Sequence, residues 1–323
     1  MEYIAIQGLN LYSKFLMSQM TKVWKQPMKA QEAFLQELIA RDRDTEYGKR
    51  YLSGIKTLQE FRNKHPLTKY DHYEEYFKRL ADGEEGVCVG CKVDRFGISS
   101  GTTGKGKLIP VVASNSAYTF LTVVLRRLFK LSPVQKRVML YCRPARKFTK
   151  SGLAIAPIFF LPENTFPFME AIQVSPGSAL LISTDFEATY IHLLFGLVNK
   201  NINMFFAPFA SQVHRALKML EHNQDMFLED LTLGRVNPRL NIDEGIRRSL
   251  DAALKADPAR ADELRREFAR GFVGIVRRIW PHLALLTTID ISGYVKKFNA
   301  TYAKCYRQLI LKTTKKNMDS YRF

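Results

Sequence analysis

The amino-acid sequence predicts an α/β fold. A helical N-terminal region gives way to strand-like runs on either side of a Ser/Thr/Gly segment at 99 to 106, and a later region, 179 to 207, has the pattern strand, helix, strand. The composition, with 46% hydrophobic and 25% charged residues, is ordinary for a folded globular protein. At 323 residues the chain can form one large domain or two small ones.

Helices are expected first. Residues 8 to 42 carry apolar side chains at helical spacing, and such a stripe usually covers a core. The stripe consists of Leu9, Tyr12, Leu16, Met20 and Val23, and the apolar pattern continues with Phe34, Leu35, Leu38 and Ile39. A short helix is expected from Thr57 to Lys64, ahead of Pro66, and another from Tyr70 to Leu80, ahead of the turn residues Asp82 and Gly83.

Two strand-like runs follow, Val93 to Ile98 and Lys107 to Val112, and they predict a hairpin with a polar loop. Ser114 is a suitable cap for a helix from Ala117 to Leu131, and residues 137 to 141 have the character of a buried strand.

The second half of the chain begins with a predicted strand, Ala179 to Ile182. Thr184 and Glu187 have capping-box spacing for a helix that reaches Val198, and strand character resumes from Ile202 to Ala207. Helices are then expected at 211–226, 243–256 and 259–278, and a strand at 284–288. From Cys305 to Phe323 the sequence loses periodicity and is basic, so that this segment resembles a tail.

Cysteine usage and targeting signals favour the cytoplasm. The four cysteines are few and scattered, and Cys88 and Cys91 have ligand spacing without the second pair that a zinc site requires, so no metal site is predicted. No run of 18 apolar residues predicts a membrane span. The N-terminus lacks the pattern of a signal peptide, and residues 3 to 31 contain four lysines and no acidic residue but no arginine, which weakens the case for an organelle import signal.

The net charge of +18 is concentrated in places. The segment from Lys130 to Lys150 holds seven basic residues and no acidic one: Lys130, Lys136, Arg137, Arg143, Arg146, Lys147 and Lys150. Such a patch can attract nucleic acid, an acidic membrane surface or an anionic ligand. The alternative, a solvated face that binds no partner, is favoured. No zinc-finger or RNA-recognition signature accompanies it, so no specific nucleic-acid partner is predicted.

The segment Ser99-Ser-Gly-Thr-Thr-Gly-Lys-Gly-Lys107 is the most informative in the chain. Its glycines let the backbone turn N–H groups inward, its hydroxyls add donors and its lysines add charge, a combination that suits a polyphosphate. The alternative is a plain Gly/Ser hairpin loop. A Walker A loop is excluded because Leu108 stands where a Ser or Thr should hold magnesium and a strand follows, and a dinucleotide fingerprint fails because no helix begins at the glycines.

Phe96-Gly-Ile-Ser-Ser-Gly-Thr-Thr-Gly104 together with Lys107-Leu-Ile-Pro110 is similar to the phosphate-binding motif of the plant auxin-responsive family of acyl-acid amido synthetases. The resemblance covers nearly all of residues 30 to 300. It includes Thr45-Glu-Tyr-Gly48, Phe61-Arg62, Pro66-Leu67, Tyr70, Gly83-Glu84, Tyr190, Leu193-Leu-Phe-Gly-Leu197, Phe209-Ala-Ser211, Leu220-Glu221, Asp230, Gly234 and Trp280-Pro281.

The resemblance implies an adenylate-forming enzyme, a ligase that uses ATP and magnesium to convert a carboxylic acid into an acyl adenylate and then lets an amino acid displace AMP. It implies an N-terminal domain of β-sheets between helices and a small C-terminal lid domain. It identifies no catalytic residue and no metal ligand in this chain. Carried onto this sequence, it assigns the ATP phosphates to Ser99, Ser100, Gly101, Thr102, Thr103, Gly104, Lys105 and Lys107.

The likeness fades after Tyr302 to Lys304, where the family continues to an adenine motif, a ribose-binding Asp and the lid. Residues 1–304 are therefore predicted to be an incomplete nucleotide-binding domain and residues 305–323 a basic tail outside the family pattern. The chain is then a truncated animal or bacterial-type member without the lid domain, inactive on its own.

Two other function classes remain open. One is a catalytically silent nucleotide-binding or interaction protein derived from the family, and the other is nucleic-acid binding through the basic segment. The six histidines show no triad or metal spacing, so hydrolase chemistry is not supported. The sequence indicates neither the acid, the amine nor the oligomeric state.

Overall fold

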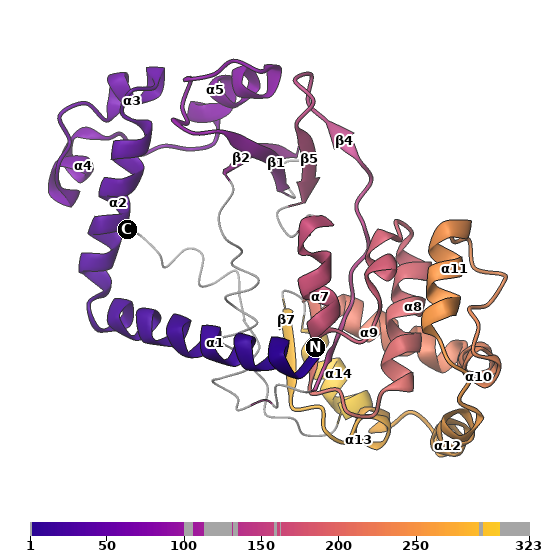
Figure 1. The fold of residues 1–323 in the computed structure, drawn as a ribbon. Helices are drawn as coiled ribbons and strands as arrows, with labels where there is room; N and C mark the ends of the chain where they lie inside the picture. The colour runs from indigo at the N-terminus through magenta and orange to yellow at the C-terminus, as the bar shows by residue number, and fades with distance from the viewer. Residues whose placement is uncertain are drawn as a thin grey trace. The chain divides into compact units, whose positions relative to one another are not determined.

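The computed structural model describes residues 2–99, 106–112, 131, 135–157, 160–161, 163–290 and 293–303. The chain divides into two compact units. The N-terminal unit comprises Gln7–Val124 and Pro144–Phe160, and the C-terminal unit comprises Met1–Ile6, Leu125–Arg143 and Leu161–Phe323. Each unit combines one β-sheet with helices, as the ribbon in Figure 1 shows, so the predicted α/β class is confirmed.

Helices of the N-terminal region precede its sheet. They are α1 (Glu2–Lys25), α2 (Pro27–Asp42), α3 (Glu46–Tyr51), α4 (Leu58–Lys64) and α5 (Asp71–Asp82). The helical stretch predicted from 8 to 42 is two helices, because Pro27 occupies the first turn of α2. Proline has no N–H to donate to the preceding turn, so it begins a helix readily and does not continue one.

The apolar stripe predicted along residues 9 to 23 covers no core in the part of the chain that the structure describes. None of residues 11–12 and 14–25 is buried, and Leu9 lies among the residues whose side chains are not described. Tyr12 is 46% exposed and Val23 41%, and on α2 Phe34 is 59% exposed. The expectation that this stripe packs against a core is therefore wrong for these residues.

Helix α4 ends at Lys64 as predicted, whereas α5 extends two residues beyond the predicted end at Leu80, so that Asp82 belongs to the helix. At α4 the Thr57 hydroxyl accepts the Glu60 N–H and the Glu60 carboxylate accepts the Thr57 N–H, which satisfies two amides at the start of the helix. Helix α5 ends at Gly83, whose φ of +104° is readily adopted only by glycine.

The sheet of the N-terminal unit contains β1 (Val93–Ser99), β2 (Lys107–Val112), β4 (Lys147–Phe148) and β5 (Ala154–Pro157) in the order β2-β1-β5-β4. β1 pairs antiparallel with β2, which confirms the predicted hairpin, and parallel with β5. Phe96 of β1 is fully buried and joins Leu80 of α5 and Tyr47 of α3 in the core of this unit. The predicted cap Ser114 and the helix from Ala117 to Leu131 lie outside the described residues, except for Leu131.

The sheet of the C-terminal unit has three parallel strands, β3 (Arg137–Met139), β6 (Met204–Phe209) and β7 (Leu285–Ile289), with β6 in the centre. Val138, Phe205 and Leu286 occupy paired positions in the three strands and join the large core around helices α8 (Asp185–Val198) and α9 (Ala210–His222). The other helices are α7 (Phe166–Ile172), α10 (Gln224–Leu233), α11 (Glu244–Ala253), α12 (Pro258–Ala269), α13 (Ile275–Ile279) and α14 (Tyr294–Phe298). Short helical turns, η1 (Glu163–Thr165), η2 (Gly177–Leu181) and η3 (Asn299–Ala303), link them.

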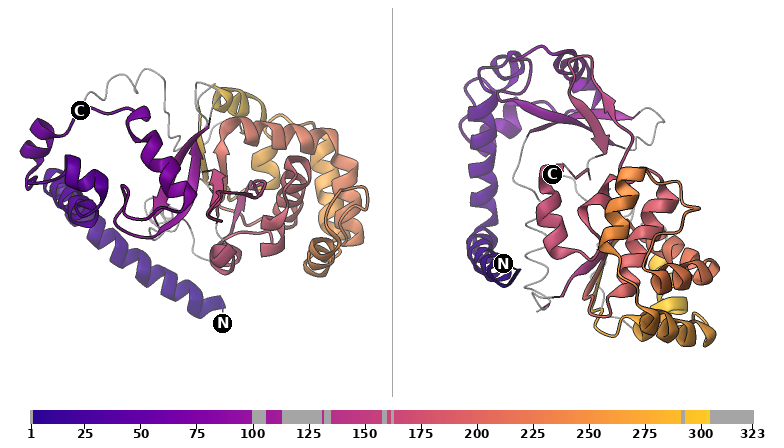
Figure 2. Two further views of the ribbon diagram at one scale, coloured as in Figure 1. Left: turned by 90° about the horizontal axis from the view of Figure 1, so that it is seen from above. Right: turned by 45° about the vertical axis from the view of Figure 1, so that its right-hand side comes forward.

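Helices α8, α9 and α10 lie side by side, as Figure 1 shows and as Figure 2 shows from two other directions. The helix predicted at 211–226 is divided into α9 and α10 at Asn223. The helix predicted at 259–278 is divided into α12 and α13 by Gly271 and Gly274, both with positive φ. The short helix predicted at 243–256 is confirmed as α11, one to three residues shorter at its ends.

The strand predicted at Ala179 to Ile182 is wrong. This segment forms the 3₁₀ turn η2, in which the Ala179 N–H donates to the Pro176 carbonyl, and the strand paired with β6 is β3. The predicted capping box at Thr184 does not form either, because the Thr184 side chain makes no capping bond. Glu187 instead accepts the Asn241 N–H at 3.4 Å.

Helix α8 is buried along most of its length. Its residues from Tyr190 to Leu197 are all buried, so its last carbonyls cannot be satisfied by water. The Trp280 indole Nε1–H donates to the Gly196 carbonyl at 2.7 Å, and the Arg260 Nε–H donates to the Leu197 carbonyl at 2.8 Å. Arg260 also donates to the Ile279 carbonyl at 2.9 Å and pairs with Glu263 at 3.1 Å. This one buried guanidinium therefore links three elements.

We expect Arg260→Ala to lower the free energy of unfolding by on the order of 3 kcal/mol, because it leaves two buried carbonyls without their donor and removes one of the two cations paired with Glu263. Arg265→Ala is the matched control, since Arg265 lies on the same helix and is exposed in its pair with Asp262. Its effect should stay within about 0.5 kcal/mol. Urea unfolding of both variants measures the difference, and equal losses would contradict the role given to Arg260.

Candidate functional site in the loop between β1 and β2

The ends of the Ser/Thr/Gly loop are held by the hairpin. Ser99, the last residue of β1, is the register partner of Lys107, the first residue of β2, and Ile98 is the partner of Leu108. The loop that joins these strands therefore starts and finishes at two adjacent backbone positions. Of the predicted phosphate-binding residues the structure places the Ser99 backbone and Lys107, whereas Ser100, Gly101, Thr102, Thr103, Gly104 and Lys105 lie outside the described residues.

Lys107 is positioned by Tyr70. The Tyr70 hydroxyl donates to the Leu108 carbonyl at 3.2 Å and accepts the Leu108 N–H at 3.1 Å, which ties the residue that precedes α5 to the start of β2. The Lys107 ammonium lies 5.1 Å from the centre of the Tyr70 ring, within range of a cation–π contact. Among the described residues no carboxylate forms an ion pair with Lys107. Its charge is therefore available for an anion at the loop.

Tyr70 was not predicted as a site residue. In the sequence it marks the start of a helix and belongs to the family resemblance, and it lies 37 positions before Lys107. Its contact with β2 depends on the packing of α5 against the sheet, and no local pattern reveals that packing.

The basic segment from 130 to 150 is not one solvated face. Its residues belong to both units, with Arg143 in the C-terminal unit and Pro144 in the N-terminal one. Arg137 is buried, with 3% of its surface exposed, and the charge of Arg143 is paired with Glu163. The Lys150 ammonium is paired with Asp82 at 3.1 Å. Lys130 lies outside the described residues. The favoured expectation of a solvated face is therefore wrong for Arg137, whereas Arg146, Lys147 and Lys150 are exposed, as that expectation requires.

The cysteine pair provides no metal site in the described part of the chain, where no three histidine, cysteine or acidic side chains gather. Cys88 is buried, and this burial raises the pKa of its thiol to about 12. A thiol with that pKa stays protonated at neutral pH and is a poor metal ligand.

His192 forms a buried polar pair with Ser175. The imidazole Nε2 lies 2.8 Å from the Tyr141 carbonyl, which can only accept, so Nε2 carries the proton. Nδ1 then accepts the Ser175 hydroxyl proton at 2.8 Å. Both residues are at least 99% buried, so no substrate reaches the serine, and the pair serves to satisfy polar groups in the core. His192 therefore has a structural role in the core.

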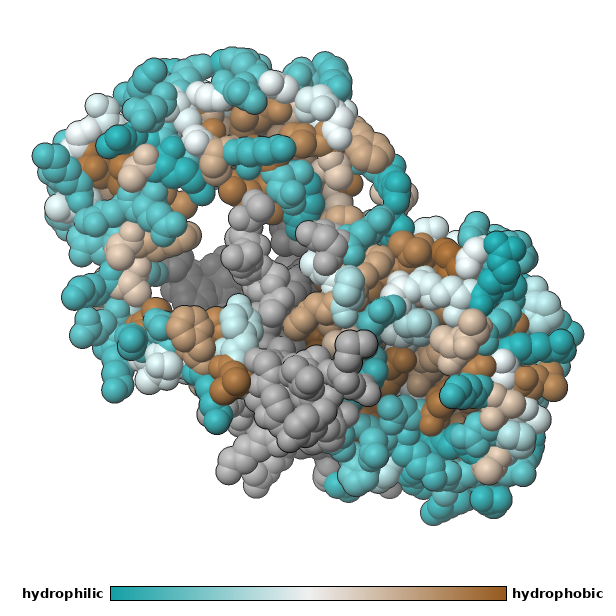
Figure 3. Space-filling model, in the orientation of Figure 1, coloured by the Kyte–Doolittle hydropathy of each residue, from teal (hydrophilic) through white to brown (hydrophobic). Residues whose placement is uncertain are grey.

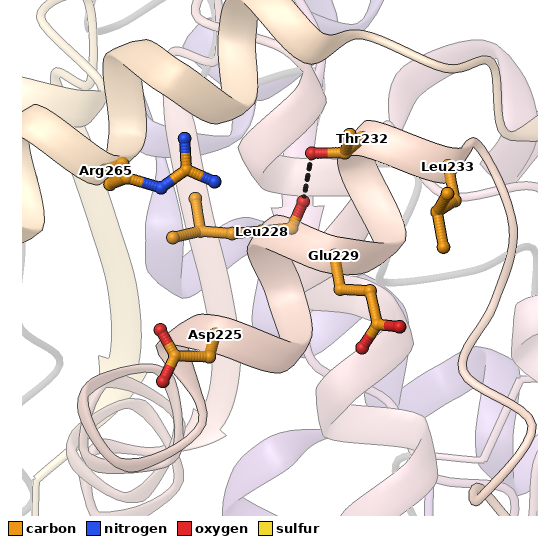
Figure 4. Close-up of a pocket in the computed structure, with 6 residues that line it drawn as sticks. All are labelled: Asp225, Leu228, Glu229, Thr232, Leu233 and Arg265. Atoms are coloured by element: carbon orange, nitrogen blue, oxygen red, sulfur yellow. Dashed lines mark hydrogen bonds between the residues drawn. The ribbon is translucent and has the colours of Figure 1, made fainter.

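A surface depression of about 400 Å³ in the C-terminal unit lies away from the loop in sequence and belongs to α10 and α12. Figure 4 shows the Arg265 guanidinium beside Leu228 of α10, with the Glu229 carboxylate pointing away from it. The only hydrogen bond drawn there is local, from the Thr232 hydroxyl to the Leu228 carbonyl at 2.7 Å. We assign no chemistry to this depression.

The fold of two α/β units with a hairpin that carries a Ser/Thr/Gly loop has close counterparts. The family model described as "GH3 family N-terminal domain" matches residues 16–306, so the chain belongs to the GH3 family. The chain is similar to a probable indole-3-acetic acid-amido synthetase GH3.1 of Oryza sativa subsp. japonica, with 29% identity over 289 residues. It is also similar to the probable indole-3-acetic acid-amido synthetase GH3.1 of Arabidopsis thaliana, with 28% identity over 288 residues.

These matches cover most of this chain but only about half of each relative. These matches include 82% and 84% of this chain but 47% and 48% of the relatives, so the chain spans about half the length of the curated relatives that it matches. Among solved structures, the GH3.15 acyl acid amido synthetase shares the fold, with a TM-score of 0.79, 22% identity, and coverage of 91% of this chain and 54% of that chain.

Stability should fall in acid because of His192, whose burial lowers its pKa to about 4. An unfolded chain, with a histidine pKa of about 6.5, takes up the proton first as the pH falls. The neutral imidazole of His192 therefore makes its full contribution to stability above pH ~6.5. The free energy of unfolding falls by on the order of 3 kcal/mol as the pH falls toward 4. Urea unfolding across this window should show a steeper loss in the wild type than in His192→Gln. His222→Gln, at an exposed histidine, should keep the wild-type slope, and an equal slope in His192→Gln would contradict the assignment.

Proposed function

We propose that this chain supplies the phosphate-binding part of an ATP-dependent acid-amino acid ligase. The observation that carries the proposal is the geometry at the hairpin, where Lys107 stands opposite Ser99 at the mouth of the Ser/Thr/Gly loop with no carboxylate paired to it among the described residues. Relatives that are similar to this chain in sequence are named as amido synthetases, which supports the proposed class of reaction.

In this proposal the loop binds the phosphates of ATP. Backbone N–H groups at Gly101 and Gly104 and the hydroxyls of Ser100, Thr102 and Thr103 donate to phosphate oxygens. Lys105 and Lys107 offset the charge of the polyphosphate, which is highest in the pyrophosphate that leaves. The substrates are a carboxylic acid, whose oxygen attacks the α-phosphate, and an amino acid, whose amine displaces AMP.

Magnesium belongs to the proposed reaction, where it would neutralise phosphate charge when bound. The described residues do not by themselves form a site for it, because no three metal-ligating side chains gather among them. No step is therefore assigned to a metal in this chain.

We further propose a cytoplasmic setting and a boundary near residue 304, with residues 1–304 as the nucleotide-binding domain and 305–323 as a basic tail. The family match, which ends at residue 306, supports this boundary. In the described part of the chain no helix is both long and apolar enough to cross a membrane.

Lys107→Ala should weaken ATP binding roughly tenfold or more, because it removes a charge-assisted contact to the phosphates. Isothermal calorimetry with ATP and with pyrophosphate measures the effect. Tyr70→Phe tests the support of this lysine, because it keeps the ring and removes both hydrogen bonds to Leu108; it should weaken binding less than Lys107→Ala.

Lys92→Ala is the matched control, since Lys92 is an exposed lysine just before β1. It changes the net charge by the same amount without altering the loop, so its affinity should equal that of the wild type. Equal weakening by Lys92→Ala and Lys107→Ala would show a general charge effect and would contradict the loop assignment.

The 323-residue chain by itself should bind ATP without acid-dependent exchange of labelled pyrophosphate into ATP. The chain spans about half the length of its curated relatives, and adenylate formation needs ATP held at both ends. Placement of reacting groups accounts for ~7 to 11 kcal/mol of such a barrier. Exchange that depends on the acid and disappears in Lys107→Ala would show a working site within these residues and would refute this expectation.

A further inference from the structure

A second pocket, of about 690 Å³, lies in the N-terminal unit. Its described lining residues belong to α2, to α3 and to the turn at residues 52 to 56 that joins α3 to α4. This volume is within the range of pockets that hold small molecules. All these residues precede Thr57, whereas the Ser/Thr/Gly loop begins at Ser99, so the pocket is a separate candidate site.

The pocket combines apolar and basic side chains. Leu52 and Ile55 line it and are buried, and Ile39 of α2 is half-buried. Exposed lining residues include Lys49 and Lys56. In Figure 3 the surface over α2, α3 and α4 is mostly teal, with small brown areas among the hydrophilic residues. A ligand held here therefore meets apolar groups on its inner side and positive charge at the mouth.

Two positive charges at this mouth lack a counter-charge. Three basic residues line the pocket, and Asp44, the acidic residue among the described lining residues, is paired with one of them, Arg43, at 3.5 Å. Lys49 and Lys56 form no ion pair with a described residue. Their ammonium groups are therefore available to an anion, as the Lys107 ammonium is at the loop.

The turn after α3 adds hydrogen-bond donors to these charges. Its Gly54 has a φ of +67°, which glycine adopts readily. The Ser53 N–H, the Ser53 hydroxyl and the Gly54 N–H make no hydrogen bond with another described residue. Successive free N–H groups in a turn are donors that suit the oxygens of an anion.

The turn is held in place from both sides. The Gln36 amide of α2 donates to the Lys56 carbonyl at 3.1 Å, and the Lys64 ammonium of α4 donates to the Gly54 carbonyl at 3.2 Å. The Glu60 carboxylate accepts the Lys56 N–H at 2.7 Å. A ligand therefore does not have to order this segment when it binds, which reduces the cost of binding.

We propose that this pocket binds a phosphate monoester with an apolar body. Such an ester carries close to two negative charges at neutral pH, which match the Lys49 and Lys56 ammonium groups. The donors of Ser53 and Gly54 bind its phosphate oxygens, and its apolar body contacts Ile39 and the buried side chains of the turn. A carboxylate has one charge and leaves one lysine uncompensated, whereas inorganic phosphate leaves the apolar surface in water.

Octyl phosphate, kept below the concentration at which it forms micelles, is a suitable probe for isothermal calorimetry. It should bind at least about tenfold more tightly than inorganic phosphate, octanol or octanoate, because each of these lacks one part of the chemistry. A free metabolite and a lipid can both supply it. Sedimentation with vesicles that contain phosphatidic acid, lost in Lys49→Gln/Lys56→Gln, would identify the lipid, and binding of octyl phosphate alone would identify the free molecule.

Two variants test the two parts of the pocket. Lys49→Gln/Lys56→Gln removes the unpaired charges and should weaken octyl phosphate binding at least about tenfold. Ala40→Trp changes no charge but fills space at an exposed lining position of α2, so it should weaken binding as well, whereas Ala40→Ser should not.

The matched control is Lys69→Gln/Lys92→Gln, which removes two exposed lysines of the same unit that are not among the lining residues. It should leave the affinity nearly unchanged. Lys107→Ala should do the same, because the proposed pocket does not depend on the loop. Circular dichroism checks that each variant folds.

Four results would overturn the proposal. They are equal affinity for octyl phosphate and inorganic phosphate, equal affinity for octyl phosphate and octanol, equal weakening in the control variant, and wild-type affinity in Ala40→Trp. Loss of binding in Lys107→Ala would also overturn it, because the phosphate would then be bound at the Ser/Thr/Gly loop.

Discussion

The C-terminal unit depends on keeping the last carbonyls of the buried helix α8 hydrogen-bonded. An unpaired carbonyl in a core costs about as much as several apolar contacts contribute, and α8 ends inside the protein. Trp280 and Arg260, more than sixty positions away in the chain, donate to Gly196 and Leu197. Gly196 cannot carry a side chain, because a Cβ there would lie 2.7 Å from Val138 of β3. The helix, the sheet and α12 are therefore fixed together by a few polar contacts within an apolar core.

The N-terminal unit uses the same principle for the proposed site. Buried Phe96 anchors β1, and the Tyr70 hydroxyl anchors the first peptide of β2, so both ends of the loop are fixed by side chains that do not belong to it. A loop rich in glycine loses much conformational entropy when it binds a ligand. Fixed ends reduce that loss, which is why a hairpin is a suitable frame for binding phosphates through backbone N–H groups.

Local patterns in the sequence predicted the elements whose signals are local. The helix from Thr57 to Lys64, the glycine that follows α5 and the strands on either side of the Ser/Thr/Gly segment are confirmed. The predictions failed where distant residues decide. The apolar run at 179 to 182 forms a turn because β3, from a region forty residues earlier, occupies the place beside β6. For the same reason the Tyr70 support of Lys107 could not be predicted, although Lys107 itself was.

The availability of charge is also hard to predict from the sequence. The sequence shows how many charged residues a segment has, but only the structure shows which of them are buried or paired. The segment from 130 to 150 has the denser run of basic residues, yet Arg137 is buried and Arg143 and Lys150 are paired with carboxylates. The segment from 3 to 31 has fewer basic residues, and its lysines have no acidic neighbour within the segment at all. A paired charge contributes little field beyond a few ångströms, whereas neighbouring unpaired charges add together. The number of basic residues in a segment therefore does not show how much of their charge is available to a partner.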